Sequence, residues 1–317
     1  AIERSMLNTN LAAVSLDGRH FFYENMLRRT KKLGYKLIWP LTRSQYILSY
    51  CCPPNLARAI AQSSEYAYTV SKDTLWFGLY GANRAELSLE NGARFTIRQQ
   101  TDYPYDGQIL LNICRHTKTA FKLNIRIPGW LSSGSISWNG RTITLNKKDA
   151  ASYCTLTLGD EDFSLQSDMD STDTENAGCC EIKIVFHMPV RYTAAHAMAE
   201  EAAGQAAIER GPLVYCMESA DTKAHTLDDL MIDLHSAWEI TPYKVGGRTV
   251  AALETQLYCM NRDSYDRDAL YQEIHDEGME PVSARFIPYF AWDNRGFGEM
   301  RIWFPVAYGL HFQSPEI

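Results

Sequence analysis

The feature that most constrains the fold is a change of periodicity near Glu65. Before it, apolar residues recur every three or four positions, as in "MLNTNLAAV", which is typical of an amphipathic helix. After it, apolar and polar residues alternate in short runs separated by turn residues, which indicates antiparallel strands. Asn91-Gly92 and Asn139-Gly140 each lie between two such runs, and Asn-Gly is the strongest short-range signal of a β-hairpin. The chain is therefore expected to be mainly β, with a short helical N-terminal segment.

Two helices are expected in that N-terminal segment. The periodic apolar residues predict one helix over residues 3–15, ended by the turn that contains Gly18. Asn55 is a suitable N-cap for a second helix over residues 56–66. Residues 1–65 therefore form one predicted region.

The β-rich remainder is predicted to form two β-sandwiches, over residues 66–190 and 191–317. Many short strands with frequent turn signals are typical of sandwich folds. Two acidic stretches, residues 159–178 and 261–280, interrupt the strand pattern. The first is expected to be a solvated loop, because a segment with few apolar residues has little to bury.

Composition narrows the classes of function. The chain has 317 residues, 45% of them hydrophobic and 22% charged, as in ordinary globular proteins. A net charge of −7 without a basic stripe argues against a nucleic-acid partner. No apolar run approaches the roughly 20 residues that cross a bilayer, so no membrane partner is expected.

Eight cysteines in a chain of this length do not indicate a disulfide scaffold. Cys114 and Cys216 lie in apolar strand-like text and are expected to be buried thiols. Cys179-Cys180 follows an acidic run and lacks the prolines, and it is interpreted as a structural or incidental pair. Reduced thiols of this kind predict a cytoplasmic protein.

The stretch "YILSYCCPPNLARAI" (residues 46–60) carries the main candidate site. Pro53 and Pro54 interrupt regular structure directly after Cys51 and Cys52, so the backbone is expected to turn there. A turn can direct both sulfurs to one place. Three interpretations follow from the residues: two buried thiols, a vicinal disulfide, or half of a zinc site, because zinc favours thiolate ligands.

A resemblance to a known family selects among these interpretations. "YCCPPNLARAI", "LWFGLYGANRAELSL", "QQTDYPYDGQILLNI", "AAIERGPLVYCME" and "FIPYFAWDNRGFGEMRIW" occur in this order. Together with "ERSMLNTNLAAVSLDGRHFFYENML" near the N-terminus, they closely resemble glycoside hydrolase family 127, the β-L-arabinofuranosidase (DUF1680) family. That family has an (α/α)6 barrel followed by two β-sandwiches. Residues 1–65 would then be the end of the barrel, and the chain the C-terminal half of such an enzyme.

The resemblance also implies residue roles. Cys51 would be the catalytic nucleophile and a zinc ligand, Cys52 a second zinc ligand, and Tyr23 would line the sugar pocket. The family's other zinc ligands, in a Glu-x-Cys motif, and its acid/base glutamate belong upstream of residue 1, and no Glu-x-Cys precedes Cys51 here. The chain alone is therefore expected to be inactive.

The implied partners are an arabinose-containing glycan, the upstream barrel half of the enzyme and, in a homodimer, a second copy. The alternative is a non-catalytic β-sandwich module that binds carbohydrate or a protein. Exposed tryptophans would favour that alternative. Five tryptophans, however, lie in segments predicted to be strands and are expected in the core: Trp76, Trp130, Trp138, Trp292 and Trp303.

Overall fold

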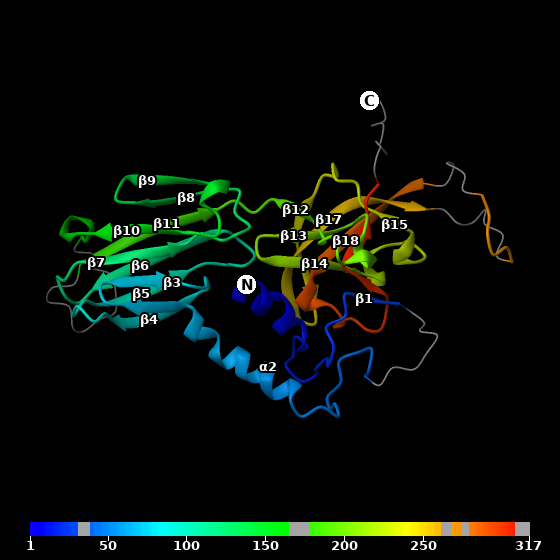
Figure 1. The fold of residues 1–317 in the computed structure, drawn as a ribbon, viewed down its shortest axis with the longest axis horizontal. Helices are drawn as coiled ribbons and strands as arrows, with labels where there is room; N and C mark the ends of the chain where they lie inside the picture. The colour runs from blue at the N-terminus through cyan, green and yellow to red at the C-terminus, as the bar shows by residue number, and fades with distance from the viewer. Residues whose placement is uncertain (31–38, 165–177, 261–267, 274–278, 308–317) are drawn as a thin grey trace. The chain divides into compact units, whose positions relative to one another are not determined.

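The chain forms two compact units in the computed structural model (Figure 1). One unit comprises Arg58–Pro189, and the other combines Ala1–Ala57 with Val190–Ile317. The structure describes residues 1–30, 39–164, 178–260, 268–273 and 279–307. Most of the two acidic stretches lies outside these described residues.

The helical N-terminal segment is shorter than the sequence predicts. Helix α1 (Ile2–Arg4) continues as the π-helix η1 (Ser5–Asn10), and helical structure ends at Ala12 rather than at residue 15. Gly18 lies in the turn that follows and has a φ of +75°, which glycine adopts without steric cost. The predicted stop is therefore confirmed to within a few residues.

The second helix begins earlier than predicted. Helix α2 spans Cys52–Ala61 and continues as the 3-10 helix η2 (Gln62–Tyr66). Asn55 is not its N-cap but lies inside it. The prolines are tolerated because the N–H groups of a helix's first turn have no partner within the helix, so their absence removes no hydrogen bond. The turn expected after the cysteines is instead a helix start.

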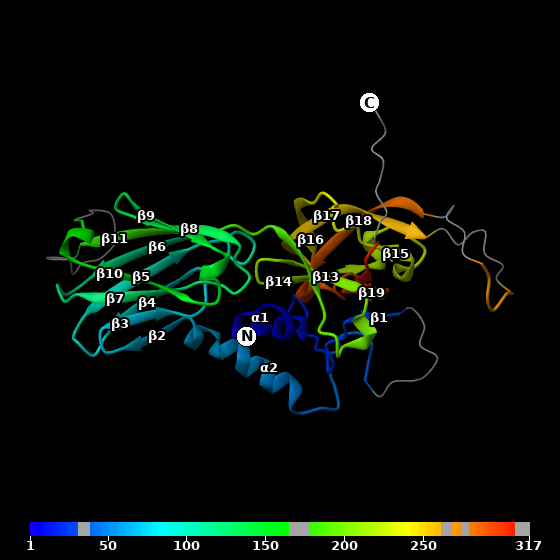
Figure 2. The same ribbon diagram turned by 45° about the horizontal axis from the view of Figure 1, so that its top comes forward.

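The described residues of the unit Arg58–Pro189 form two sheets that lie face to face (Figure 2). The first has the strand order β10-β7-β3-β2 and the second β4-β5-β6-β11-β8-β9. Phe95 on the second sheet stacks on Phe121 of the first, with ring centroids 4.4 Å apart, so aromatic packing joins the layers. The strands are β2 (Tyr68–Ser71), β3 (Thr74–Phe77), β4 (Asn83–Ser88), β5 (Arg94–Gln100), β6 (Gln108–Arg115), β7 (Phe121–Arg126), β8 (Ser133–Trp138), β9 (Arg141–Asn146), β10 (Tyr153–Leu158) and β11 (Cys179–Phe186).

Both predicted Asn-Gly hairpins are present in this unit. Strands β8 and β9 are joined by Asn139 and Gly140 alone, with φ values of +45° and +73°. Two positive φ values in a two-residue loop match the right-handed twist of the strands, which explains the preference for Asn-Gly. Asn91 and Gly92 lie in the longer loop between β4 and β5.

One expectation about the cysteines is wrong. Cys114 of β6 and Cys179 of β11 lie directly opposite each other and form a disulfide. They are 65 residues apart in sequence, so only the strand register brings them together. Cys180 and Cys216 are buried free thiols. The expectation of reduced cysteines therefore fails for this pair, and the cytoplasmic location inferred from it stays a prediction.

In the described residues of the other unit, ten strands form one network (Figure 1). Its longest path has the order β1-β19-β14-β18-β17-β15, and β13 joins β12, β14 and β20. Phe286 of β18 contacts Phe304 of β20 at 5.4 Å, although β13 and β14 separate these strands in the sheet. Since neighbouring strands lie about 4.8 Å apart, the network must curl over its own core.

The N-terminal segment contributes one strand to this network. Strand β1 pairs with β19, although the two are more than 270 residues apart in sequence. The strands are β1 (Arg28–Arg29), β12 (Val190–Ala194), β13 (Gln205–Arg210), β14 (Leu213–Glu218), β15 (Leu230–Met231), β16 (Glu239–Val245), β17 (Arg248–Met260), β18 (Met279–Pro288), β19 (Met300–Arg301) and β20 (Trp303–Pro305).

The predicted fold class is confirmed: short N-terminal helices are followed by two β-sheet regions. Between residues 70 and 155 the only helical element is the three-residue turn η3 (Lys147–Asp149). Within the described ranges, the helices are all too short or too polar to cross a membrane.

Candidate active site

The two adjacent cysteines lie at the start of helix α2. The carbonyl oxygen of Cys51 accepts a hydrogen bond from the backbone N–H of Asn55 at 3.1 Å, so Cys51 is the N-cap. Cys51 is exposed and Cys52 is half-buried. A helix N-terminus carries a partial positive charge, which favours a thiolate over a thiol.

A serine two residues earlier holds both sulfurs. Ser49 Oγ lies 3.1 Å from Cys51 Sγ and 3.3 Å from Cys52 Sγ, and the two sulfurs are 3.6 Å apart. They are therefore not a vicinal disulfide. Hydrogen bonds from Ser49 and then from Cys52 lower the pKa of the Cys51 thiol. By contrast, burial raises the pKa of Cys180 to about 12.

The spacing of the two sulfurs suits a shared metal ion. Two thiolates about 2.3 Å from one tetrahedral zinc ion stand roughly 3.8 Å apart, close to the 3.6 Å between Cys51 and Cys52. In the described part of the chain, no three His, Cys, Asp or Glu side chains gather as a metal site. Cys51 and Cys52 thus fit two positions of a four-ligand zinc site.

Tyr23, the third residue predicted for the site, packs against a different residue from the cysteine pair. Its ring stacks on Trp39 with centroids 3.7 Å apart, and its side chain is about two-fifths exposed. Among the described residues, no hydrogen bond or ring contact links Tyr23 to Cys51 or Cys52. The stacked pair is an aromatic surface of the kind that sugar rings pack against.

A loop from the C-terminal part of the same unit holds the segment that leads to the cysteines. We call Trp292–Arg295 the anchor loop. The Asp293 carboxylate accepts hydrogen bonds from Nη1 of Arg29 and, at 2.9 Å, from the backbone N–H of Arg43. Asn294 Oδ1 accepts from the backbone N–H of Leu16 at 3.0 Å. Three separate points of the N-terminal segment are thereby fixed to one loop.

Arg43 and Trp292 extend this anchoring. The buried Arg43 guanidinium donates to the carbonyl oxygens of Ala12, at 2.8 Å, and of Trp292. Burial lowers the pKa of Arg43 to about 10, and the nearby Asp293 opposes that shift. Trp292 is fully buried and stacks on Phe22 at 4.8 Å, with the Arg29 guanidinium 4.7 Å from its ring centroid.

The anchor loop is itself held by acidic residues. Arg295 bridges Glu218 and Asp221, with Nε 3.0 Å from Glu218 and Nη1 2.7 Å from Asp221. Glu218 also accepts from the backbone N–H of Asp293 at 2.9 Å. From the sequence, Trp292 was expected in the core, but Asp293, Asn294 and Arg295 were given no role, although a dense polar run after an apolar strand was a usable signal.

Comparison with known proteins identifies the class of protein. Residues 1–65 match the GH127 β-L-arabinofuranosidase catalytic domain. Residues 74–161 match the GH127 middle domain, and residues 190–305 match the family 127 C-terminal domain. The chain is therefore a glycoside hydrolase family member with the end of a catalytic domain and two β domains. It belongs to the GH127 β-L-arabinofuranosidase family.

Individual relatives agree with this assignment. A non-reducing end β-L-arabinofuranosidase of Bifidobacterium longum subsp. longum is 28% identical over 95% of this chain and 44% of its own length. The structure of a GH127 β-L-arabinofuranosidase from Geobacillus stearothermophilus T6 is 28% identical, with a TM-score of 0.82 over 96% of this chain and 45% of that one. A structure described as a glycoside hydrolase is 33% identical, with a TM-score of 0.83, and 48% of it is covered. The chain thus spans a little less than half the length of these relatives.

Proposed function

We propose that this chain is the C-terminal part of a retaining glycoside hydrolase that releases a terminal L-arabinofuranose from glycans. Family membership and the names of the relatives support the substrate class. The observation that carries the chemistry is the sulfur pair at the start of α2, with Cys51 exposed and its pKa lowered.

In this proposal Cys51 and Cys52 hold a zinc ion together with ligands from the upstream part of the catalytic domain. When bound, the metal keeps a thiol ionised at neutral pH. Cys51 Sγ attacks the anomeric carbon while the glycosidic C–O bond breaks, and an acid group protonates the leaving oxygen. Water then displaces the sulfur from the sugar, and the proton it loses returns to that acid/base group.

The acid/base group is proposed to come from the upstream part of the catalytic domain, as the family resemblance implies. Cys52 would serve as a metal ligand, and Tyr23 with Trp39 would provide an aromatic wall for the sugar. We accordingly expect no turnover of an aryl β-L-arabinofuranoside by the 317-residue chain alone, and turnover when the upstream part is supplied.

The test is to trap the complete enzyme with a mechanism-based sugar electrophile and to map the adduct by peptide mass spectrometry. The label is expected on Cys51, and Cys51→Ser is expected to abolish it, because an alcohol is far less ionised than a metal-bound thiol at neutral pH. Cys52→Ser is the matched control: it should lower the zinc content, and excess zinc should partly restore labelling. A label on Cys52 or on a carboxylate would refute the role of Cys51.

A further inference from the structure

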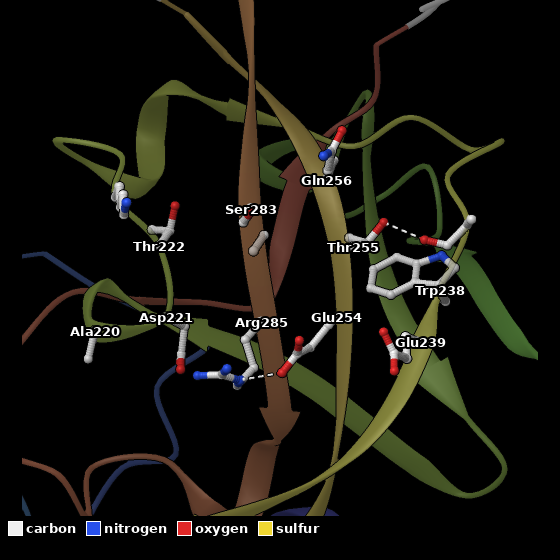
Figure 3. Close-up of a pocket in the computed structure, with 13 residues that line it drawn as sticks. Ala220, Asp221, Thr222, Trp238, Glu239, Glu254, Thr255, Gln256, Ser283 and Arg285 are labelled. Carbon is white, nitrogen blue, oxygen red and sulfur yellow. Dashed lines mark hydrogen bonds and ion pairs between the residues drawn. The ribbon is translucent and has the colours of Figure 1, made fainter. Parts of the chain in front are cut away.

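The C-terminal β region contains a groove of about 620 Å3 that lies apart from the cysteine pair in sequence (Figure 3). It crosses strands β17 and β18. Trp238 and Glu239 line it on one side, and Ala220, Asp221 and Thr222 line it on the other. All its lining residues lie between positions 220 and 285, so the groove belongs to a single compact unit.

Strand register places a row of polar side chains in this groove. Glu254 of β17 lies directly opposite Glu239 of β16 and Arg285 of β18. Directly opposite residues share one face of a sheet, so these three side chains form a row. Gln256 and Ser283 form the next pair on the same face.

Part of this row is held in place by internal contacts. Arg285 Nε donates to Glu254 Oε1 at 2.9 Å, and Thr241 donates to the same oxygen at 3.0 Å. The Arg285 guanidinium also lies 4.1 Å from the ring centroid of Tyr243. These contacts orient the planar groups of Glu254 and Arg285 before any ligand arrives, which reduces the entropy that binding would cost.

Four other polar side chains of the groove are available to bind a ligand. The side chains of Lys223, Glu239, Gln256 and Ser283 are exposed and make no hydrogen bond or ion pair within the described ranges. They offer an ammonium, a carboxylate, an amide and a hydroxyl, and therefore both donors and acceptors.

The groove also has an aromatic wall. Trp238 is half-buried, its Nε1 donates to Tyr192 Oη at 2.8 Å, and its ring meets Phe286 edge-on at 5.5 Å. The indole is therefore fixed in orientation while part of it stays accessible.

Five other tryptophans were expected in the core. Trp292 is fully buried, whereas Trp76, Trp130, Trp138 and Trp303 are only half-buried.

These features select the chemistry of a ligand. Acidic and basic side chains both line the groove, so no single-sign field favours an ion. A fixed aromatic ring beside planar donors and acceptors suits a neutral ligand with many hydroxyl groups and apolar C–H faces. We propose that this groove, whose lining includes neither Cys51 nor Cys52, binds a saccharide segment of the arabinose-containing glycan. The choice of glycan rests on the proposed function, whereas the binding site itself does not.

The test measures binding without hydrolysis. The 317-residue chain is run in native gels that contain a soluble arabinan, and separately dextran, and its retardation gives the affinity. Retardation by arabinan is expected, and Trp238→Ala should weaken it about tenfold or more, a loss of roughly 1.4 kcal/mol. Gln256→Ala and Glu239→Ala, at exposed positions that do not support the fold, should each weaken it severalfold.

Trp76→Ala is the matched control. Like Trp238, Trp76 is half-buried, donates from Nε1 to a hydroxyl and meets another aromatic ring edge-on, but it lies on β3 in the other unit. It should bind arabinan as the unchanged chain does. No retardation by arabinan, equal retardation by dextran, or unchanged binding in all three groove variants would overturn the proposal. Cys51→Ser should leave binding intact, so this result and the test of the nucleophile can fail independently.

Discussion

At the residue scale, the surroundings of the free cysteines separate Cys51 from most of the others. Burial raises the pKa of Cys154, Cys180, Cys216 and Cys259. Cys51 is exposed, and its hydrogen bonds lower its pKa. Because the thiolate is the reactive form, Cys51 is expected to react with electrophiles at a lower pH than these four.

Ser49→Ala tests the origin of that reactivity. Losing the Ser49 hydrogen bond removes the first cause of the lowered pKa, so the pKa of Cys51 should rise. The pH midpoint of iodoacetamide labelling at Cys51, followed by peptide mass spectrometry with a chelator present, should move to higher pH. Ser64→Ala, in η2, should leave the midpoint unchanged. An unchanged midpoint in Ser49→Ala would show that this hydroxyl does not stabilise the thiolate.

Asp293 is the residue whose loss should most weaken the anchor loop. Its carboxylate is about 4% exposed and pairs with a fully buried Arg29, so Asp293→Ala would leave a buried cation without its partner. Removing one partner of a buried ion pair typically costs about 3–5 kcal/mol. The backbone φ of +56° adds a further penalty, of order 1 kcal/mol, for alanine.

Asp293→Asn is the matched variant, because asparagine keeps the shape and tolerates this φ but carries no charge. Urea unfolding followed by tryptophan fluorescence should show a smaller loss for Asn than for Ala. Equal stability of all three proteins would mean that the anchor loop does not depend on this carboxylate.

At the element scale, a disulfide joins two neighbouring strands of the six-stranded sheet. β6 and β11 pair over seven residues and also share the Cys114–Cys179 bond. A crosslink that closes a loop of about 65 residues reduces the conformational entropy of the unfolded chain. In the loop-entropy model this stabilises the folded state by about 4 kcal/mol. The strand pairing and the crosslink therefore support the same register.

Replacing both Cys114 and Cys179 by Ser should lower the free energy of unfolding by up to about 4 kcal/mol. A reductant should lower the thermal unfolding temperature of the unchanged chain. It should leave the unfolding temperature of the double variant unchanged. Cys154→Ser, which removes a free thiol, should retain the response. Titration of the denatured, unreduced chain should count six thiols, and eight would disprove the crosslink.

At the scale of the whole molecule, one compact unit is formed by a single segment of the chain and the other by two separate segments. Arg58–Pro189 is continuous in sequence, whereas the other unit joins Ala1–Ala57 to Val190–Ile317. The end of the catalytic domain is thus part of the C-terminal β unit. The ring of Phe22 stacks on Trp292. Arg29 Nη1 and the backbone N–H of Arg43 donate hydrogen bonds to the Asp293 carboxylate in the anchor loop.

Fragments test this division. A fragment of residues 58–189 is expected to fold alone, with a cooperative thermal transition and a β-type circular dichroism spectrum. Residues 190–317 alone should not fold stably, because Trp292 would lose its stacking on Phe22 and Asp293 its buried cation. Adding a peptide of residues 1–57 should increase resistance to proteolysis. A stable 190–317 fragment would contradict the anchoring role.

The local features were predictable because local residues determine them. The alternation that predicted β4 and β5, and the Asn139-Gly140 turn, act within a few residues and are present in the structure. The start of α2 was not predicted, since helix-breaking prolines were weighed without their position in the first turn. The cysteine pair was recognised from its motif, whereas Ser49 as its hydrogen-bond partner was not.

The sequence by itself determined the strand-forming segments, the hairpins, the family and the cysteine pair, because each depends on a short run of residues. Only the tertiary structure decided which distant residues meet. It paired Cys114 with Cys179 through strand register, placed Asp293 between Arg29 and Arg43, and lined up Glu239, Glu254 and Arg285 across three strands. Such contacts depend on how strands pair and how the core packs, and no local pattern of residues encodes them.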